Sequence, residues 1–405
     1  MGYRGDAIKG SFWLGGFRVS SRAIAFARTF ILARILTPSQ FGIYGIATLV
    51  LSFLEIITET GINVVLIQEK DNTESYINTA WVVSIIRGII ISSALFLAAP
   101  FIAHFFKSPD AQTIVQLTAL VPLLRGFINP AEVMFQKNLA FSKEFFFRLT
   151  IYTTDTIAAT LLAVVYKTPL ALIGGLIIGA VLEVVLSFVV VKPRPVFEFN
   201  KKKFTHVISR GKWMSAAGIF QYLFREGDDV VVGRMLGTSA LGLYQVVYSL
   251  ATLPISEVAD VLGKVTLPIY VKIAHDKKRL KRAYLATTGV LMALVIPGTL
   301  ALIVFAEPII RIALGTQWVG GAPALQVLAI YAFLRTTINP LLTVLLAVKD
   351  QRAVSLVTLV NTVTLAVVIF PLTFLYGIEG TAFSTIIAVI PGIPVSYVLA
   401  RKYLQ

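Results

Sequence analysis

Long apolar segments follow one another along the whole chain, and short polar stretches separate them. An α-helix needs about 20 residues to cross the hydrocarbon core of a bilayer, and each segment reaches that length. Thr-Pro, Ser-Pro and Gly-Thr pairs fall at the joints, where helices tend to end. The pattern predicts an all-α chain with twelve membrane-spanning helices, at 11–36, 41–67, 76–106, 111–136, 145–166, 169–191, 211–236, 241–271, 283–305, 322–348, 353–376 and 379–400.

Composition supports a polytopic membrane protein and excludes a soluble one. Of 405 residues, 57% are hydrophobic and 14% are charged, and the mean hydropathy is +0.81. A soluble fold cannot hide that much apolar surface. The absence of cysteine excludes disulfides and thiolate metal sites, and the three scattered histidines have no metal-binding spacing. We therefore expect no metal and no cofactor.

The basic residues orient the chain in the membrane. A net charge of +15 would suggest a nucleic-acid partner in a soluble protein, but here most of the excess lies in loops. With the N-terminus in the cytoplasm, 23 of the 36 Lys and Arg residues fall in cytoplasmic loops and 3 in outer loops. The first apolar segment contains four arginines, which a cleavable signal sequence does not carry. We expect a retained first helix, both termini in the cytoplasm and no nucleic-acid partner.

Two stretches of the sequence occur twice. Ala-Arg-Ile-Leu-Thr-Pro-Ser-Gln-Phe-Gly-Ile-Tyr at 33–44 returns as Gly-Arg-Met-Leu-Gly-Thr-Ser-Ala-Leu-Gly-Leu-Tyr at 233–244. Leu-Arg-Gly-Phe-Ile-Asn-Pro at 124–130 returns as Leu-Arg-Thr-Thr-Ile-Asn-Pro at 334–340. The chain therefore contains an internal repeat of about 200 residues.

The repeat predicts two six-helix bundles, at 1–191 and 213–405, joined by a basic cytoplasmic linker at 192–212. Six is an even number, so each bundle begins and ends on the same side of the membrane. The two bundles should then be related by a pseudo-two-fold axis along the membrane normal. Transporters built in this way place the substrate path at the interface of the repeats.

Charged residues within the predicted spans carry the functional information. Ten arginines and lysines and ten carboxylates lie there. A central charge facing lipid costs roughly 2.5–3.5 kcal/mol even on the lenient insertion scale. Most of the twenty must therefore face a polar cavity or one another, which a purely structural scaffold does not need.

The first helix is the clearest case, since it has no carboxylate after Asp6. Arg18 and Arg22 share one stripe of the helix, and Arg28 lies about 80° away from it. Guanidinium groups stay protonated and match phosphate geometry, so these three arginines are candidates for binding a diphosphate head group. The alternative is pairing with Glu55, Glu59 or Asp155 of neighbouring helices.

Carboxylates within the spans are candidates for coupling transport to a gradient of H⁺ or Na⁺. The alternative for each is permanent pairing with an arginine, as the spacing of Arg225 and Asp229 allows within one helix. Asp228 occupies the repeat position equivalent to Arg28, which suggests complementary charges across the pseudo-axis. The candidates are Glu55, Glu59, Asp155, Asp228, Asp229, Glu257 and Asp260.

Residues that recur in both halves are candidates for gating or structural roles. Arginines at helix ends can extend to the interface, and prolines can kink helices whose neighbours satisfy the freed backbone groups. These residues are Arg34, Arg234, Arg125, Arg335, Pro130 and Pro340. No phosphate-binding loop, dinucleotide fingerprint or catalytic Ser, His and Asp set occurs in the sequence, so we expect no enzyme.

The string Phe-Ile-Leu-Ala-Arg-Ile-Leu-Thr-Pro-Ser-Gln-Phe-Gly-Ile-Tyr at 30–44, followed by Glu-Thr-Gly-Ile-Asn at 59–63, resembles the N-terminal signature of bacterial polysaccharide transporters. The string from Asp228 to Gly237 and the Leu-Gly-Leu-Tyr at 241–244 are equally typical. The chain is thus similar to the Wzx-type lipid-linked oligosaccharide flippases of the multidrug/oligosaccharidyl-lipid/polysaccharide exporter superfamily. Relatives often have two further C-terminal helices, so the chain would be a shorter subtype or a fragment.

The resemblance implies two bundles around a V-shaped central cavity. It also implies ion-coupled alternating access that moves undecaprenyl-diphosphate-linked repeat units across the bacterial inner membrane, for lipopolysaccharide or another surface polysaccharide. The cationic lumen of the family maps onto Arg18, Arg22 and Arg28. Expected partners are membrane lipids, a polysaccharide polymerase and glycosyltransferases, and we expect a monomer. A multidrug or small-molecule antiporter of the same fold is the main alternative; a membrane glycosyltransferase or ligase lacks the large outer loop that it would need.

Overall fold

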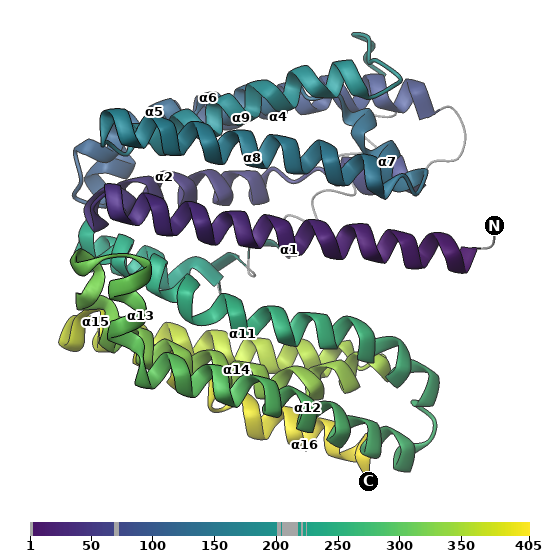
Figure 1. Cartoon of the computed structure of the whole chain (residues 1–405). Coiled ribbons are helices and arrows are strands. Elements are labelled where there is room, and N and C mark those ends of the chain that lie inside the picture. Colours follow the sequence, from purple (N-terminus) through teal and green to yellow (C-terminus); the bar gives the residue numbers. More distant parts are fainter. Residues whose placement is uncertain (1–2, 69–72, 201–203, 205–217, 220–221, 224) are drawn as a thin grey trace. The chain divides into compact units, whose positions relative to one another are not determined.

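The computed structural model describes residues 3–68, 73–200, 204, 218–219, 222–223 and 225–405. All regular elements among these residues are helices (Figure 1). Contacts within the chain divide it into two compact units, Met1–Gly227 (unit 1) and Asp228–Gln405 (unit 2). Most of the second half of the predicted linker at 192–212 lies outside the described residues, so the predicted boundary stays a prediction.

Unit 1 begins with the long helix α1 (Tyr3–Ile35). The following turn is fixed by Thr37, whose hydroxyl caps the next helix at Gln40 N while the Gln40 side chain bonds back to Thr37 N. Pro38 stands at the first helical position, where its missing N–H costs nothing. The remaining elements are α2 (Pro38–Ile57), α3 (Ile62–Gln68), α4 (Thr73–Phe105), α5 (Asp110–Thr118), α6 (Leu120–Arg125), η1 (Pro130–Val133), α7 (Met134–Lys137), α8 (Phe141–Tyr166) and α9 (Leu170–Val190).

Unit 2 begins with the end of a helix at 228–236. Gly377 interrupts the longest helix at a φ of 61°, at the turn that the sequence predicts between the last two spans. Such a left-handed conformation suits glycine because it has no Cβ. The elements are α11 (Thr238–Ile273), α12 (Lys277–Val304), α13 (Ala306–Ala313), η2 (Thr316–Gly321), α14 (Ala322–Ala347), α15 (Gln351–Val389) and α16 (Gly392–Leu404).

Eight helical stretches among the described residues are long and apolar enough to cross a membrane. Seven match one predicted span each, and the stretch Gln351–Leu404 contains the last two. A ninth candidate is a bent pair, Asp110–Arg125 with Pro130–Lys137, which corresponds to the predicted span 111–136. The helix α1 matches the first predicted span, and the predicted span 211–236 falls largely outside the described residues.

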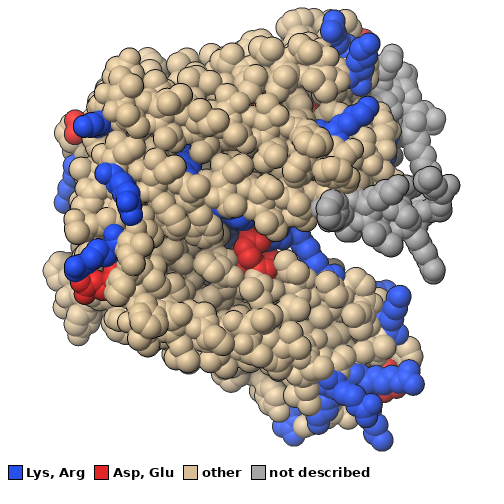
Figure 2. Space-filling model, in the orientation of Figure 1, with Lys and Arg blue, Asp and Glu red and all other residues tan. Residues whose placement is uncertain are grey.

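The flanks of these helices are largely uncharged, and basic side chains gather at helix ends (Figure 2). Exposed apolar side chains such as Phe96, Leu97 and Phe101 on α4 and Leu161 and Val165 on α8 suit contact with lipid chains. Inside unit 1, helices approach closely at small residues: a Cβ on Gly175 of α9 would lie 2.5 Å from the Cβ of Ala159 of α8. The chain is a multi-pass membrane protein.

Candidate functional site

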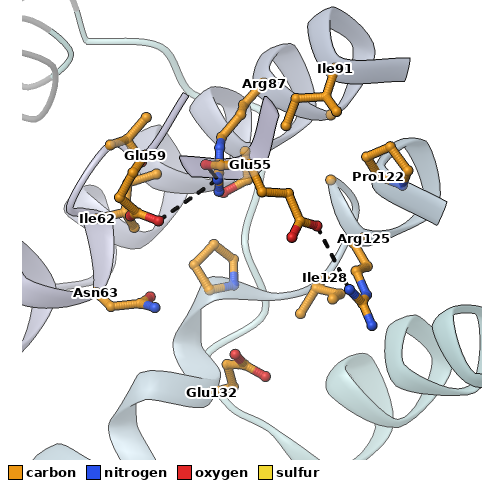
Figure 3. Close-up of a pocket in the computed structure, with 15 residues that line it drawn as sticks. Glu55, Glu59, Ile62, Asn63, Arg87, Ile91, Pro122, Arg125, Ile128 and Glu132 are labelled. Carbon is orange, nitrogen blue, oxygen red and sulfur yellow. Dashed lines mark hydrogen bonds and ion pairs between the residues drawn. The ribbon is translucent and has the colours of Figure 1, made fainter. Parts of the chain in front are cut away.

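Three adjoining cavities lie inside unit 1. Cavity A has a volume of about 220 Å³, and its charged lining residues are Glu55, Glu59, Arg87, Arg125 and Glu132 (Figure 3). The other two cavities each share part of this lining. We call the charged residues that line the three cavities the acid–arginine tract.

Cavity B, of about 590 Å³, shares three of the charged residues of cavity A. Its lining consists of Ser52, Glu55, Ile56, Glu59, Arg87, Gly218, Tyr222, Arg225 and Glu226. Cavity C, of about 170 Å³, shares Arg125 with cavity A and adds Arg148, Asp155 and Glu183. The shared residues line two cavities at once, so the acid–arginine tract continues from cavity B through cavity A to cavity C.

A break in a membrane-spanning segment shapes cavity A. The chain bends by 69° between α6 and η1. Asn129 is fully buried at the break: its N–H donates to Ser187 Oγ over 3.0 Å and its Oδ1 accepts from Ala131 N over 2.9 Å. These bonds satisfy the backbone groups that the break frees, and Pro130 has no N–H to satisfy. Irregular backbone at membrane depth is tolerated where it lines a cavity, and transporters place binding sites at such breaks.

Glycines bring α4 and α6 together beside the break. A Cβ added to Gly88 would lie 2.6 Å from the carbonyl oxygen of Pro122, and one added to Gly126 would lie 3.0 Å from that of Ser84. The two backbones are therefore in direct contact, as small residues permit in membrane helices. This contact holds Arg125 and Arg87 on opposite sides of the same cavity (Figure 3).

The ion pairs around cavity A are long. Arg125 lies 3.8 Å from Glu55 and 3.6 Å from Glu183, and Arg87 lies 3.8 Å from Glu59. Arg87 also donates to the backbone carbonyl of Glu55 over 2.6 Å and to Thr58 Oγ1 over 3.1 Å, so it also satisfies the C-terminal end of α2. A charge-assisted hydrogen bond is typically 2.7–2.9 Å long, so the three contacts are ion pairs without a direct hydrogen bond. Glu59 Oε1 also accepts from Gly61 N over 3.1 Å.

Near the break, two carboxylates each keep an oxygen that accepts no hydrogen bond from the described residues. Glu132 Oε2 is buried and has no hydrogen-bond partner among the described residues. Glu144 Oε1 accepts from Gln136 Nε2 over 2.8 Å and from Arg148 Nε over 2.9 Å, while its Oε2 is equally unpartnered within the described part of the chain. A buried acceptor without a donor is costly, so these oxygens are poised to accept a hydrogen bond.

The predicted diphosphate-binding arginines of α1 differ from one another. Arg28 Nη1 lies 2.8 Å from Asp155 Oδ2, and the two side chains are 13% and 10% exposed. The alternative that the sequence leaves open, pairing with a carboxylate, is therefore what Arg28 shows. Arg18 is partly buried and Arg22 is exposed on the same helix. That Arg18, Arg22 and Arg28 bind a diphosphate stays a prediction.

Two of the four ion-coupling candidates of unit 2, Asp228 and Asp229, lie in a buried network. Tyr244 OH donates to Asp228 Oδ2 over 2.8 Å, and Gln245 Nε2 donates to Asp229 Oδ2 over 2.9 Å. Asp228 and Asp229 are both buried, whereas Glu257 is partly exposed and Asp260 exposed on α11. Their roles in coupling remain predictions, as do those of Glu55, Glu59 and Asp155 in unit 1.

The residues predicted to gate or support the helices occupy several settings. Arg335 Nη1 donates to Tyr331 OH over 3.1 Å, whereas Arg125 faces cavities A and C. Pro130 begins η1 after the break, and Pro340 lies inside the uninterrupted helix α14. Arg34 lies exposed in the last turn of α1, and Arg234 is partly buried in the helix at 228–236. In unit 1, Arg225 lies 3.9 Å from Glu226.

Sequence analysis did not identify five members of the site and its surroundings. Arg87, Glu132 and Glu183 are among the charges within the predicted spans. The sequence places Glu132 on one helix face with Arg125 but indicates no partner for Arg87 or Glu183. Glu144 and Arg148 are four residues apart, a spacing that pairs side chains on one helix and could have revealed them. Among the described residues, no group of three or more His, Cys, Asp and Glu could hold a metal ion.

Comparisons with known proteins agree with this architecture. The family model for "Polysaccharide biosynthesis protein" matches residues 31–323. The teichuronic acid biosynthesis protein TuaB of Bacillus subtilis is 25% identical over 84% of this chain and 71% of its own length. The lipopolysaccharide biosynthesis protein WzxC of Escherichia coli is 24% identical over 86% of this chain and 71% of its own length.

Among solved structures, the lipid II flippase MurJ in an inward closed conformation superposes with a TM-score of 0.77. It is 16% identical, and the match covers 95% of this chain and 87% of MurJ. This likeness shows the fold. It confirms the predicted fold class, an all-α polytopic membrane protein, and the family match confirms the resemblance seen in the sequence.

Proposed function

Because the chain belongs to the polysaccharide biosynthesis protein family, we propose that it is a flippase for lipid-linked oligosaccharides. It moves an undecaprenyl-diphosphate-linked repeat unit across the bacterial inner membrane by alternating access, for the synthesis of a surface polysaccharide. Both termini face the cytoplasm, as the distribution of basic residues favours. The names of TuaB and WzxC, both polysaccharide biosynthesis proteins, support this substrate class.

The observation that carries the proposal is the acid–arginine tract inside unit 1. Charges in a membrane-spanning bundle are costly and usually mark a substrate or ion path. The tract runs through three adjoining cavities beside a broken helix, whereas the outer helix flanks carry apolar side chains. A substrate with a polar head and a lipid tail needs both kinds of surface.

In this proposal Arg18 and Arg22 bind the diphosphate, and Arg28 acts with Asp155 to fix the position of α1 against α8. The fixed fork of a guanidinium suits phosphate oxygens better than an ammonium does. Coupling to H⁺ or Na⁺ through the predicted carboxylates is part of the same proposal.

Reconstitution tests the function directly. Proteoliposomes with the full chain should translocate a fluorescent polyprenyl-diphosphate-linked sugar, and Arg18→Gln and Arg22→Gln should each slow this transport about tenfold or more, the effect of losing one charge-assisted hydrogen bond. Arg311→Gln is the matched control, because Arg311 is an exposed arginine paired with Glu307 on α13. Transport at the wild-type rate in both α1 variants would refute the assignment of the arginines, and no transport by the wild type would refute the flippase.

A cation-exporting antiporter is the second candidate, and one observation favours it. Cavity A has three carboxylates and two guanidinium groups, a balance that attracts cations. Proteoliposomes that accumulate tetraphenylphosphonium against a pH gradient, but do not move the lipid-linked sugar, would establish this alternative.

A further inference from the structure

The ion pairs of Arg125 beside cavity A are longer than hydrogen bonds. Elsewhere in unit 1, Arg28 and Asp155 close to 2.8 Å, so this bundle can form tight pairs. Arg125 lies 3.8 Å from Glu55 and 3.6 Å from Glu183. An arginine and a glutamate held apart in this way leave room for a third group that accepts from one and donates to the other.

The charge balance of cavity A disfavours phosphate as that third group. Glu55, Glu59 and Glu132 oppose Arg87 and Arg125, so three carboxyl groups face two guanidinium groups. A hydroxyl group donates one hydrogen bond and accepts others, so it can bridge an arginine and a glutamate that are held apart. It can also supply the donor that the buried Glu132 Oε2 lacks among the described residues.

Cavity B extends the same chemistry and adds an aromatic ring. It shares Glu55, Glu59 and Arg87 with cavity A. Tyr222 lines cavity B, is 6% exposed, and is held in place by the bond from its OH to the Leu49 carbonyl over 2.7 Å. The volume of cavity B, about 590 Å³, falls within the usual range of ligand pockets, about 300–1,000 Å³. The adjoining cavity A adds about 220 Å³.

We propose that cavities A and B form a saccharide subsite, in which Glu55, Glu59, Arg87, Arg125 and Glu132 bind the hydroxyl groups of the sugar while the diphosphate lies elsewhere. Arg18 and Arg22 are not among the described residues that line these cavities, so head-group binding and sugar binding use different side chains of unit 1. This inference rests on the proposed function and specifies which residues bind which part of the substrate.

Binding measurements with two kinds of probe test the subsite. The probes are farnesyl diphosphate and its glucose, galactose and N-acetylglucosamine conjugates, titrated into the purified full chain by calorimetry. At least one conjugate should bind the wild type about tenfold or more tightly than farnesyl diphosphate, the gain of one or more hydrogen bonds. Glu132→Gln, Glu59→Gln and Arg125→Gln should each remove most of this gain and leave the affinity for farnesyl diphosphate unchanged.

The controls separate the subsite from its alternatives. Glu307→Gln, a similarly exposed carboxylate on α13, should alter neither affinity. Size exclusion and thermal melting show whether each variant folds. The side chains of Glu59 and Arg125 are 43% and 42% exposed, so we expect their substitution to leave the fold intact. These two variants therefore test the subsite even if Glu132→Gln does not fold. A parallel titration with tetraphenylphosphonium reports on cation binding.

Four outcomes would overturn the inference. Equal affinities for farnesyl diphosphate and every conjugate would refute the saccharide subsite alone. Parallel losses for both kinds of probe would assign these residues to the head group, and a loss confined to tetraphenylphosphonium would assign them to a cation. If neither kind of probe binds the wild type, the proposed function and the subsite fail together.

Discussion

One sequence motif has different structures in the two units. Leu-Arg-Gly-Phe-Ile-Asn-Pro at 124–130 ends a helix and bends the chain by 69°, whereas Leu-Arg-Thr-Thr-Ile-Asn-Pro at 334–340 lies within the uninterrupted helix α14. Both copies contain the proline that weakens a helix. Proline is therefore compatible with either outcome, and the surroundings decide between them.

The surroundings differ in the residues that replace the lost backbone bonds. In unit 1, Ser187 of α9 and the side chain of Asn129 satisfy the free groups, and Gly126 contacts the backbone of α4. In unit 2, Thr336 stands at the position of Gly126 and is buried, and α14 continues through the motif. A repeated motif thus fixes the location of a weak point in a helix, and tertiary contacts determine whether the helix breaks there.

The arginine of the motif also has different surroundings in the two units. Arg125 faces two cavities between carboxylates that it does not fully engage. Arg335 bonds to Tyr331, whose ring lies 6.1 Å from that of Tyr248, in an aromatic group that also includes Tyr244. Unit 1 uses the position to line a polar space, and unit 2 uses it to bind its own helices together.

The largest expected effect is the loss of stability when the ion pair of Arg28 and Asp155 in unit 1 is broken, compared with the loss of the Tyr244–Asp228 hydrogen bond in unit 2. Asp155→Ala should destabilise the protein by about 3–5 kcal/mol, because it leaves the buried Arg28 charge without its partner. Tyr244→Phe, which removes a donor to Asp228, should cost about 1–3 kcal/mol. Chemical unfolding in detergent micelles measures both values.

A double variant is the control for that comparison. Arg28→Leu combined with Asp155→Leu should recover much of the stability lost in Asp155→Ala, because it removes both buried charges. If Tyr244→Phe is the more damaging substitution, the polar network of unit 2 outweighs the ion pair of unit 1, and our comparison is wrong.

A second contrast uses two glycines that lie 210 residues apart on α4 and α12. Gly88→Ala should destabilise the protein by about 1–3 kcal/mol, because the new Cβ would lie 2.6 Å from the Pro122 carbonyl oxygen and force α4 from α6. Gly298→Ala should be neutral or stabilise by up to about 1 kcal/mol, since a Cβ there meets no described atom within 4 Å. Thermal melting compares the two, and equal shifts would contradict the close backbone contact beside cavity A.

The smallest effect concerns pH and the loop before α15 in unit 2. Asp350 Oδ2 accepts from Lys402 Nζ and Tyr403 OH, each over 2.9 Å, and these bonds hold the pKa of Asp350 below its ordinary value. A lowered pKa contributes stability that is fully present above the ordinary value, about 3.9, and is lost as the pH falls through the folded value. The melting temperature of Asp350→Asn should therefore fall less steeply than that of the wild type on acidification below about pH 5.

In Lys402→Met the melting temperature should likewise fall less steeply on acidification than in the wild type, because the substitution removes the main cause of the lowered pKa of Asp350. An unchanged acid slope in both variants would show that the link between α16 and the start of α15 does not govern the response to acid.

Much of the fold could be predicted from the sequence, because hydrophobic runs and turn residues set the spans locally. The turn near Gly377 and the joint at Pro38 lie where the pattern places them. The break after Arg125 could not be predicted, since the copy at 334–340 carries the same Arg, Asn and Pro without a break. The deciding contacts, Gly126 with α4 and Asn129 with Ser187, join residues that are distant in sequence.

For the candidate site, the sequence identified the types of residue better than their partners. Counting charges within the spans found most members of the tract, but pairing Arg28 with Asp155 rather than with a ligand depends on how α1 packs on α8. Glu132 differs from other carboxylates only in its surroundings, because burial and the lack of a donor arise when η1 folds against its neighbours.

The pairing of Arg28 with Asp155 sets an order for biosynthesis. The two residues are 127 positions apart, so at about 5–20 residues per second a ribosome needs roughly 6 to 25 s to make the second after the first. Until α8 has been made, the charge of Arg28 therefore lacks the Asp155 carboxylate that it contacts in the finished bundle. Early assembly of unit 1 must accommodate that arginine without this contact.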